Sequence, residues 1–321
     1  MNEFDALKAA FCHAAHTPLV PLLPESTQAR AVKTYFDRYG LTPLWREAQQ
    51  VYAGFIESGR FLLWCQVWSP PRPVGTAFVV HGYFDHMGLY RHLLKRLLAR
   101  GWRVVLWDLP GHGLSSGARA TIESFDDYRH CLHVVQAALT AQALVPTPWV
   151  GVGQSTGASI LATDALRLQS ATPWSALVLL APLVRPRGWR QASALHRLAS
   201  PFVRSVRRQH RPNSTDAAFV EFLRYQDPLQ SEQLSLVWVG AMRRWMAQLL
   251  AQPPSTLPVL MIQGEQDHTV DWAYNLGVLA AKFPHAEVYH HPLARHHLVN
   301  EAEPIREALF ATLEAFLDEL P

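Results

Sequence analysis

Short, almost wholly apolar runs recur along most of the chain and predict β-strands. We expect strands at residues 76–81, 103–108, 149–154, 176–181, 259–263 and 286–290. Runs of this kind are typical of strands that are covered on both faces of a parallel sheet. Two earlier runs, at 51–57 and 60–68, are separated by Ser58-Gly59 and predict a hairpin.

Longer segments with apolar side chains at helical spacing lie between most of these runs. Residues 89–100 carry leucines at 89, 93, 94, 97 and 98, a period near 3.6 residues. The same pattern predicts helices at 125–143, 158–168, 272–283 and 305–320. Alternation of strands and helices predicts a doubly wound α/β sheet, in which ligands bind at the carboxyl ends of the strands.

One interval breaks this alternation. About 75 residues separate the strand that ends at Ala181 from the strand that starts at Val259, which is longer than a compact sheet needs for a connection. We therefore predict a mostly helical cap at 184–256, inserted over the strand ends. The core then consists of residues 46–183 and 257–321. Residues 1–45 are an N-terminal extension, with a helix expected at 27–39.

Composition excludes several classes of protein. Of 321 residues, 49% are hydrophobic and 17% are charged, which is the balance of a globular protein and not of a disordered one. Lys and Arg number 29 against 26 Asp and Glu, and a net charge of +3 argues against general nucleic-acid binding. The longest unbroken apolar run, at 176–181, is too short for a transmembrane helix.

The N-terminal residues and the cysteines predict a cytoplasmic protein. Glu3 and Asp5 stand where a secretory signal peptide has basic residues, and histidines and a proline interrupt the stretch that follows. Cys12, Cys65 and Cys131 lie far apart and are odd in number, so no disulfide framework is expected. A reducing compartment suits three free thiols.

Candidate chemistry begins at Gly153-Gln154-Ser155-Thr156-Gly157, a G-x-S-x-G between an expected strand and an expected helix. In this context the pattern predicts a nucleophile elbow, a strained turn that lifts the serine hydroxyl out of the sheet. Glycines at both ends have no Cβ, so strand and helix can approach the turn closely. A serine hydroxyl is a weak nucleophile by itself, and Ser155 therefore needs an adjacent base.

A dinucleotide-binding turn is the competing interpretation, because glycines at 151, 153 and 157 lie between a strand and a helix. The fingerprint G-x-G-x-x-G needs a glycine where Thr156 stands, and an acid at the end of the next strand. That strand ends in Leu-Ala-Pro at 180–182. We therefore expect no nucleotide cofactor. Four histidines at 290–297 come without a convincing carboxylate or cysteine set, so we expect no metal.

An acid and then a histidine should follow the nucleophile along the chain. Asp267 lies just past the end of an expected strand and is the candidate acid, with Glu265 and Asp271 as weaker candidates. The loop after the last strand carries His296 and His297 side by side. A histidine on this loop can reach both the serine and the aspartate, and spacing alone does not choose between the two.

The oxyanion of a tetrahedral intermediate needs two backbone N–H donors. Thr156, which follows the nucleophile, is expected to supply one. The turn after the first parallel strand reads HGYFDH at 81–86, and we expect Tyr83 in this turn to supply the other.

Four segments together carry a resemblance to a known family. They are HGYFDHMGLY at 81–90, DLPGHGLSSG at 108–117, GQSTG at 153–157, and the pair QGEQDHTVD at 263–271 with ARHHLVNE at 294–301. In this respect the chain resembles the lysophospholipase and monoacylglycerol lipase branch of the α/β-hydrolases, which is also classed with the S33 serine aminopeptidases. The resemblance implies an α/β-hydrolase fold with a mostly parallel eight-stranded sheet flanked by helices and an inserted helical cap.

The resemblance also assigns residues. In this family HG-x-x-(D/E)-H supplies an oxyanion donor from the residue after HG, which matches Tyr83, and the aspartate three residues after the QG pair matches Asp267. The family's loop commonly reads A-R-H-E-L, so its histidine falls on His296 and its glutamate on His297. Gln154 replaces the usual histidine of G-H-S-x-G, and we expect this position to face away from the nucleophile. The loop at 108–113 is expected to have no chemical role.

The expected activity is hydrolysis of carboxylic esters of lipids, either lysophospholipids or monoacylglycerols, through an acyl-enzyme on Ser155. The alternatives are a general carboxylesterase on small esters, a peptidase with the same three residues, and a catalytically silent binding protein. A dehalogenase is disfavoured because its nucleophile is a carboxylate.

The predicted cap has an unusual charge pattern. Residues 185–211 contain eight arginines and no acid, with apolar side chains interleaved. A basic amphipathic cap would meet an anionic membrane surface or a phosphate head group; a solvated arginine-rich helix face is the other interpretation. Further on, bulky apolar residues at 238, 242, 245 and 246 lie at helical spacing and predict core packing or an acyl-chain wall.

Overall fold

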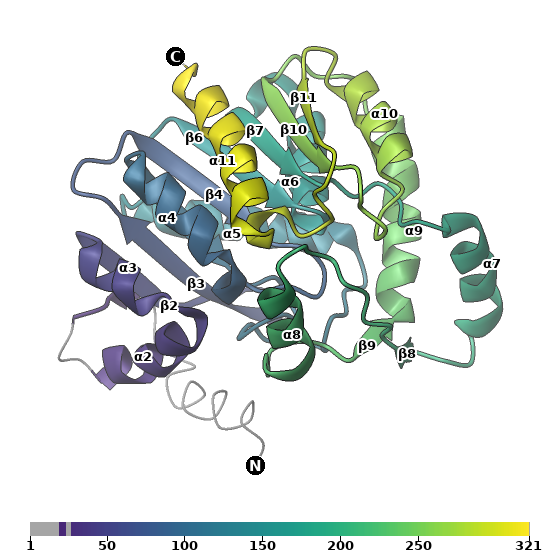
Figure 1. Ribbon diagram of the computed structural model, residues 1–321, viewed down its shortest axis with the longest axis horizontal. Helices are drawn as coiled ribbons and strands as arrows, with labels where there is room; N and C mark the ends of the chain where they lie inside the picture. Colours follow the sequence, from purple (N-terminus) through teal and green to yellow (C-terminus); the bar gives the residue numbers. More distant parts are fainter. Residues whose placement is uncertain (1–18, 24–26, 321) are drawn as a thin grey trace.

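The computed structural model describes residues 19–23 and 27–320, so Cys12 and the residues that argue against a signal peptide lie outside the described part. Its centre is a nine-stranded sheet with strand order β1-β2-β3-β5-β4-β6-β7-β10-β11 (Figure 1). The strands are β1 (Val20–Pro21), β2 (Gln50–Ser58), β3 (Phe61–Ser69), β4 (Gly75–Val80), β5 (Trp102–Trp107), β6 (Trp149–Gln154), β7 (Trp174–Leu180), β10 (Val259–Gly264) and β11 (Glu287–His291). Neighbouring strands are parallel from β5 onward in this order and antiparallel before it.

Helices cover both faces of the sheet. One face carries α5 (Phe125–Ala141), α6 (Thr156–Leu168), α9 (Leu236–Ala251) and α10 (Trp272–Lys282). The other face carries α2 (Thr27–Tyr39), α3 (Thr42–Glu47), α4 (Arg91–Ala99) and α11 (Glu303–Asp318).

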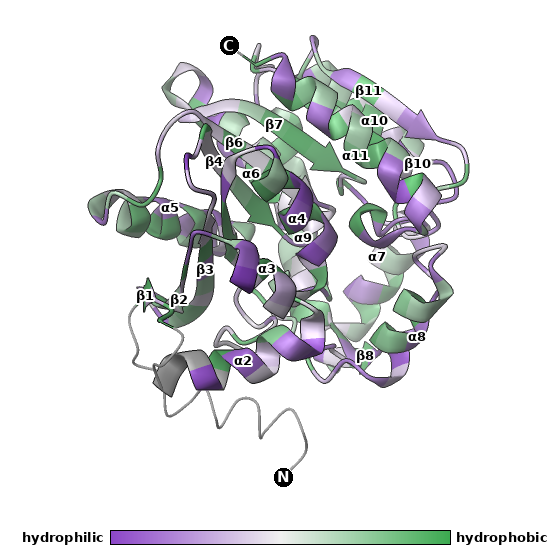
Figure 2. Cartoon of the chain, turned by 60° about the vertical axis from the view of Figure 1, so that its left-hand side comes forward, coloured by the Kyte–Doolittle hydropathy of each residue, from purple (hydrophilic) through white to green (hydrophobic). Residues whose placement is uncertain are grey.

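Strand β4 shows why two helical layers are needed. Phe78 and Val80 belong to the core on the first face, whereas Ala77 and Val79 belong to the core on the second. Successive side chains of a strand point to opposite faces, so a strand between two helical layers is apolar at every position. Figure 2 shows the same property as continuous hydrophobic colour along β7.

The strands and helices expected from the sequence all form, with ends that differ by one or two residues. The sheet has nine strands and not the predicted eight, because β1 pairs antiparallel with β2 through Val20 and Ala53. Strand β1 is two residues long, and so short an element has no alternation that a sequence pattern could reveal.

Helices make up somewhat less than half of the chain between β7 and β10, so this segment is less helical than the sequence pattern predicts. It forms α7 (Trp189–Ala199), α8 (Ala217–Tyr225) and α9, and it also forms a two-stranded antiparallel sheet of β8 (Ser205–Arg207) and β9 (Gln233–Ser235). The sequence pattern does not predict these two strands, because three-residue strands in an arginine-rich segment show no apolar alternation. The bulky residues of α9, including Trp245, are buried in the core on the first face, in agreement with the core-packing interpretation. The boundaries at 184 and 256 stay predictions.

The N-terminal extension packs on the sheet through an aromatic cluster. The rings of Tyr35 in α2 and Trp64 in β3 lie 6.1 Å apart between centroids, edge to face. At the end of the same helix, the Tyr39 hydroxyl donates to Asp227 Oδ1 at 2.8 Å. Asp227 Oδ2 in turn lies 3.0 Å from His86 Nε2. The extension therefore joins the HGYFDH turn to the segment that follows α8.

Candidate active site

Ser155 lies in the turn that joins β6 to α6. Its φ of 53° and ψ of −110° fall in a region that residues other than glycine rarely adopt and that stores strain. Its N–H donates to the Leu180 carbonyl on β7 at 2.8 Å. A Cβ on Gly157 would lie 2.0 Å from the Val80 carbonyl oxygen, and one on Gly153 would lie 2.5 Å from the backbone of α6. Both outer positions of the motif therefore require glycine, and the turn has the geometry of a nucleophile elbow.

The carboxylate of Asp267 is buried just past the end of β10. Its Oδ1 accepts the N–H groups of Thr269 at 2.7 Å and Val270 at 3.2 Å. Its Oδ2 lies 2.7 Å from His296 Nδ1. Burial raises the pKa of this carboxyl, but the His296 imidazole and the two N–H groups outweigh burial and lower it. Asp267 is therefore ionised at neutral pH.

His296 lies on the loop after β11, and this loop crosses directly over the QG pair. A Cβ on Gly264 would lie 2.3 Å from the carbonyl oxygens of Ala294 and Arg295, so only glycine allows the crossing. Burial lowers the pKa of His296, but the Asp267 carboxylate outweighs burial, and the pKa lies above its ordinary value. An ionised carboxylate only accepts, so we infer that Nδ1 carries the proton of the neutral ring and that Nε2 is free to act as a base.

Two contacts hold the histidine loop in place from neighbouring segments. The side-chain amide of Gln154 donates to the His296 carbonyl oxygen at 2.8 Å, which ties the serine turn to the histidine loop. The Asn213 carbonyl accepts the N–H groups of His296 at 3.1 Å and His297 at 2.8 Å. Among the described residues, no hydrogen bond to the Ser155 hydroxyl is formed. Contacts of this kind often tighten only when substrate binds.

Gln154 and Asn213 are positions to which the sequence analysis gave no role. Gln154 departs from the histidine that the family usually has beside the nucleophile, and that departure is the signal that could have drawn attention to it. Asn213 acts through its backbone carbonyl. Every residue type carries this group, so no sequence signal could have identified it.

The two expected oxyanion donors lie beside the nucleophile. Thr156 is the first residue of α6, where N–H groups have no partner within the helix. The N–H of Tyr83 makes no hydrogen bond with a residue in the described ranges. A Cβ on Gly82 would lie 3.2 Å from Ser155 Cβ, so the loop that carries Tyr83 passes next to the serine. The Tyr83 ring stacks on Trp238 of α9 with centroids 3.9 Å apart, which fixes this loop.

The 108–113 loop is hydrogen-bonded to the segment at 81–87, which contains Tyr83. The buried Asp108 carboxylate accepts the N–H of Met87 at 2.8 Å and the N–H of Leu114 at 2.8 Å. His81 Nε2 accepts the N–H of Leu109 at 2.9 Å. These bonds connect the two loops.

The other acid and histidine candidates do not join Asp267. His297 is buried, but its Nε2 lies 3.2 Å from Asp85 Oδ1 and so faces a different carboxylate. Glu265 is exposed to solvent. Asp271 forms an ion pair at 2.6 Å with an arginine of the segment after β7. The structure therefore pairs one acid with one histidine of the candidate set, and these are the two that the resemblance implies.

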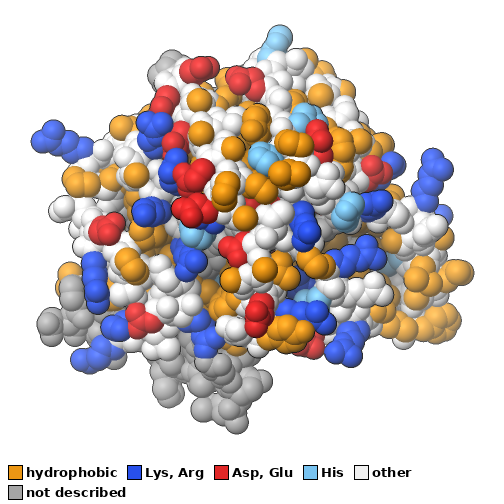
Figure 3. Space-filling model, viewed as in Figure 1, with side chains coloured by type: hydrophobic (Ala, Val, Ile, Leu, Met, Phe, Trp, Pro, Cys, Tyr) orange, Lys and Arg blue, Asp and Glu red, His pale blue; other side chains and the backbone are white. Residues whose placement is uncertain are grey.

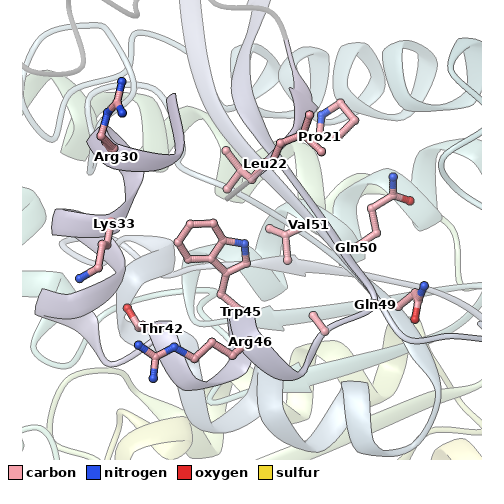
Figure 4. A pocket seen from close by; sticks show the side chains of 12 residues that line it. Pro21, Leu22, Arg30, Lys33, Thr42, Trp45, Arg46, Gln49, Gln50 and Val51 are labelled. Atoms are coloured by element: carbon pink, nitrogen blue, oxygen red, sulfur yellow. The ribbon is translucent and has the colours of Figure 1, made fainter. Parts of the chain in front are cut away.

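A cavity of about 700 Å³ lies elsewhere, between α2, α3 and the start of β2 (Figure 4). Its lining combines Arg30, Lys33 and Arg46 with Trp45 and apolar side chains. Strand β2 is four strands away from β6 in the sheet. Neighbouring strands are about 4.8 Å apart, so about 19 Å separates this cavity from the serine turn. The candidate active site is therefore at the strand ends and not in this cavity.

Comparisons with known proteins identify the family of this chain. A model of the family described as "Serine aminopeptidase, S33" matches residues 71–303. Over 262 residues the chain is 25% identical to phospholipase YtpA from Bacillus subtilis (strain 168), which covers 78% of this chain and 98% of that protein. Over 219 residues it is 27% identical to the monoglyceride lipase of Rattus norvegicus, which covers 65% of this chain and 71% of that protein.

Solved structures show the same fold. A soluble variant of the monoglyceride lipase from Saccharomyces cerevisiae superposes with a TM-score of 0.71 at 17% identity, covering 83% of this chain and 94% of that one. The monoacylglycerol lipase of Paleococcus ferrophilus gives 0.66 at 19% identity, covering 80% and 98%. These matches confirm the α/β-hydrolase fold. Because the family match spans well over half of its length, the chain belongs to the serine aminopeptidase S33 family of α/β-hydrolases.

Proposed function

We propose that this protein hydrolyses carboxylic esters of lipids through an acyl-enzyme on Ser155. The observation that carries the proposal is the 2.7 Å contact between Asp267 Oδ2 and His296 Nδ1. The backbone of His296 is hydrogen-bonded to Gln154, the residue before a serine on a strained turn. An orienting acid, a base and a nucleophile are the three groups that acyl transfer requires. Relatives named as a phospholipase and as monoglyceride lipases support lipid esters as the substrate class.

In the proposed acylation step, His296 Nε2 takes the proton of Ser155 Oγ while Oγ attacks the ester carbonyl carbon. Asp267 keeps the proton of the neutral ring on Nδ1 and stabilises the imidazolium that forms. The N–H groups of Thr156 and Tyr83 donate to the oxyanion. When the intermediate collapses, the bond to the alcohol oxygen breaks and the alcohol leaves with the proton from Nε2.

Deacylation repeats the same steps with water. Nε2 of His296 takes a proton from water, and the oxygen attacks the acyl carbonyl of the ester on Ser155. The oxyanion again lies against the two N–H donors. Oγ then leaves with the proton from Nε2, and the fatty acid departs. Neither acylation nor deacylation changes the oxidation state of any atom.

A fluorophosphonate probe and a turnover panel test this proposal. The full-length protein is expected to react covalently with the probe and to hydrolyse lysophospholipids, monoacylglycerols or short esters. Ser155→Ala should lose both properties, whereas Ser200→Ala, at an exposed position after α7, should keep them. Undiminished activity in Ser155→Ala would disprove the mechanism. Hydrolysis of aminoacyl anilides in place of acyl esters would favour the peptidase alternative.

We also propose that the protein contacts anionic membranes through α7 and the turn after it, and that it works in the cytoplasm. Leu195 is 67% exposed, Leu198 74% and Phe202 87%. Figure 3 shows this apolar patch at the right edge of the molecule with basic side chains around it. An apolar face with arginines beside it is typical of helices that lie in a membrane surface. In the described part of the chain, no helix is long and apolar enough to span a bilayer.

Vesicle sedimentation tests the membrane contact. We expect retention on anionic vesicles that weakens with salt, and little retention on neutral ones. Phe202→Ser should reduce retention, whereas Tyr225→Ser, an exposed aromatic change on α8, should not. Equal retention on neutral and anionic vesicles would contradict the proposal.

A further inference from the structure

A small cavity lined by cations lies in the segment between β7 and β10. Its volume is about 40 Å³, and its charged or titratable lining is Arg208, His210, Arg211 and Arg224. No acidic side chain lines it. A water molecule needs about 10–15 Å³ of such space, so the cavity has room for a compact group such as a phosphate. An acyl chain would not fit.

The three arginines of this cavity have no carboxylate partner. In the described ranges, no Asp or Glu oxygen lies within 4.0 Å of the guanidinium nitrogens of Arg208, Arg211 or Arg224. Arg208 is half-buried, and Arg211 and Arg224 are exposed. The half-buried Arg96, by contrast, lies 2.6 Å from Glu314. An anionic ligand in the cavity would give these arginines a charged partner.

Arg208 is the most firmly held of the three. Its Nη1 donates to Gln230 Oε1 at 2.7 Å, and its guanidinium carbon lies 4.0 Å from the centre of the Phe84 ring. Its Nε and Nη2 donate to no residue that the structure describes. A half-buried guanidinium with spare donors is fixed in place before a ligand binds, so little side-chain entropy is lost on binding.

Two contacts connect the residues of the cavity with the candidate active site. Asn213 is part of its lining, and the Asn213 carbonyl holds the N–H group of His296. Phe84, which lies under Arg208, directly follows Tyr83 in the loop that passes beside the serine. A substrate whose ester carbonyl is at Ser155 could therefore place another part of the same molecule in the cavity.

We propose that Arg208, Arg211 and Arg224 form a subsite for the phosphate of a lysophospholipid whose acyl ester is cleaved at Ser155. This inference rests on the proposed ester hydrolysis. Guanidinium groups present paired N–H donors that match phosphate oxygens. A monoacylglycerol has a hydroxyl in place of the phosphate and gains little from three cations. The subsite therefore selects anionic head groups.

His210 supplies a spectroscopic readout for the same subsite. Burial and the charge of Arg208 lower the pKa of His210, because both disfavour the imidazolium. A phosphate in the cavity brings negative charge beside this ring and should raise its pKa. The shift can be followed by NMR with the inactive Ser155→Ala protein and an ether-linked lysophospholipid analogue that cannot be hydrolysed.

The activity test compares a short-chain lysophosphatidylglycerol with the monoacylglycerol of the same acyl chain, both below their micelle concentrations. In Arg211→Gln/Arg224→Gln we expect kcat/KM for the phosphate ester to fall roughly tenfold to a hundredfold, mainly through KM. The monoacylglycerol should change less than about twofold, because it makes no charged contact there. Arg46→Gln/Arg72→Gln removes the same charge from two exposed positions away from the cavity and from α7, and should leave both substrates unchanged.

The other outcomes would contradict either the subsite or the proposed function. An equal loss on both substrates, or an equal loss in Arg46→Gln/Arg72→Gln, overturns the subsite. If inorganic phosphate binds Ser155→Ala as tightly as the ether analogue, the cavity is a site for free anions and the head-group assignment is wrong. If the wild-type protein hydrolyses neither ester while the analogue still binds and loses affinity in Arg211→Gln/Arg224→Gln, the proposed function fails and the subsite stands.

Discussion

Replacing Asp267 by asparagine should remove most activity and leave the fold intact. Oδ1 accepts the N–H groups of Thr269 and Val270, so the amide oxygen of the asparagine must stay there and its NH2 group must face His296 Nδ1. Two donors cannot share one hydrogen bond. The imidazole would therefore carry its proton on Nε2 and lose the base that Ser155 needs. By analogy with the same change in another Ser–His–Asp hydrolase, we expect kcat to fall by roughly 10⁴-fold, about 5.4 kcal/mol of barrier.

The pH profile gives a second measurement of the same perturbation. Because Asp267 raises the pKa of His296, wild-type kcat/KM should rise with pH through a midpoint above the ordinary imidazole value of about 6.5. Below that midpoint the imidazolium cannot accept a proton, so activity is lost. Without the carboxylate charge, the midpoint of the residual activity should move to lower pH.

A short-chain p-nitrophenyl ester followed over a pH series is a suitable assay, with circular dichroism and thermal unfolding to show that Asp267→Asn is folded. Retention of more than about a tenth of wild-type kcat, with an unshifted midpoint, would refute the assigned role of Asp267 and the tautomer argument.

Three further predictions concern substitutions of single residues. Gln154→Met keeps the volume but removes the amide that holds the His296 carbonyl, and we expect kcat to fall about tenfold with KM unchanged in steady-state assays. A change confined to KM would contradict a positioning role. Gly157→Ala should lower the free energy of unfolding in urea by more than about 3 kcal/mol, because its Cβ would lie 2.0 Å from a carbonyl oxygen. Gly277→Ala, on α10 with nothing within 4 Å of the new Cβ, should raise the free energy of unfolding by up to about 1 kcal/mol. Equal effects of these two glycine changes would show that the elbow is not tightly closed. Tyr39→Phe should cost about 1–2 kcal/mol in the same assay, since it removes a donor to the buried Asp227, and a neutral result would show that the N-terminal helix does not hold the loop after α8.

The chemistry of the site could be predicted from the sequence because its geometry depends on backbone positions that only certain residues tolerate. Gly153 and Gly157 mark the elbow, since any Cβ there would collide with β4 or α6. Gly264 marks the place where the histidine loop crosses β10. The central strands could also be predicted from their apolar runs, because burial on both faces excludes polar residues. Strand β1 and the small sheet of β8 and β9 could not be predicted, because these strands are too short to show a period.

The amino-acid sequence by itself determined the sheet, its helical layers and the tight turn that carries Ser155, because each of these depends on local spacing or on a steric requirement within a few residues. Only the tertiary structure decided which histidine meets Asp267 and which faces Asp85, since the two are neighbours in sequence and differ only in where the loop directs them. It also decided that Asn213 holds the histidine loop and that three arginines surround one small cavity. These arrangements bring together groups from distant parts of the chain, and their positions depend on packing that no local pattern encodes.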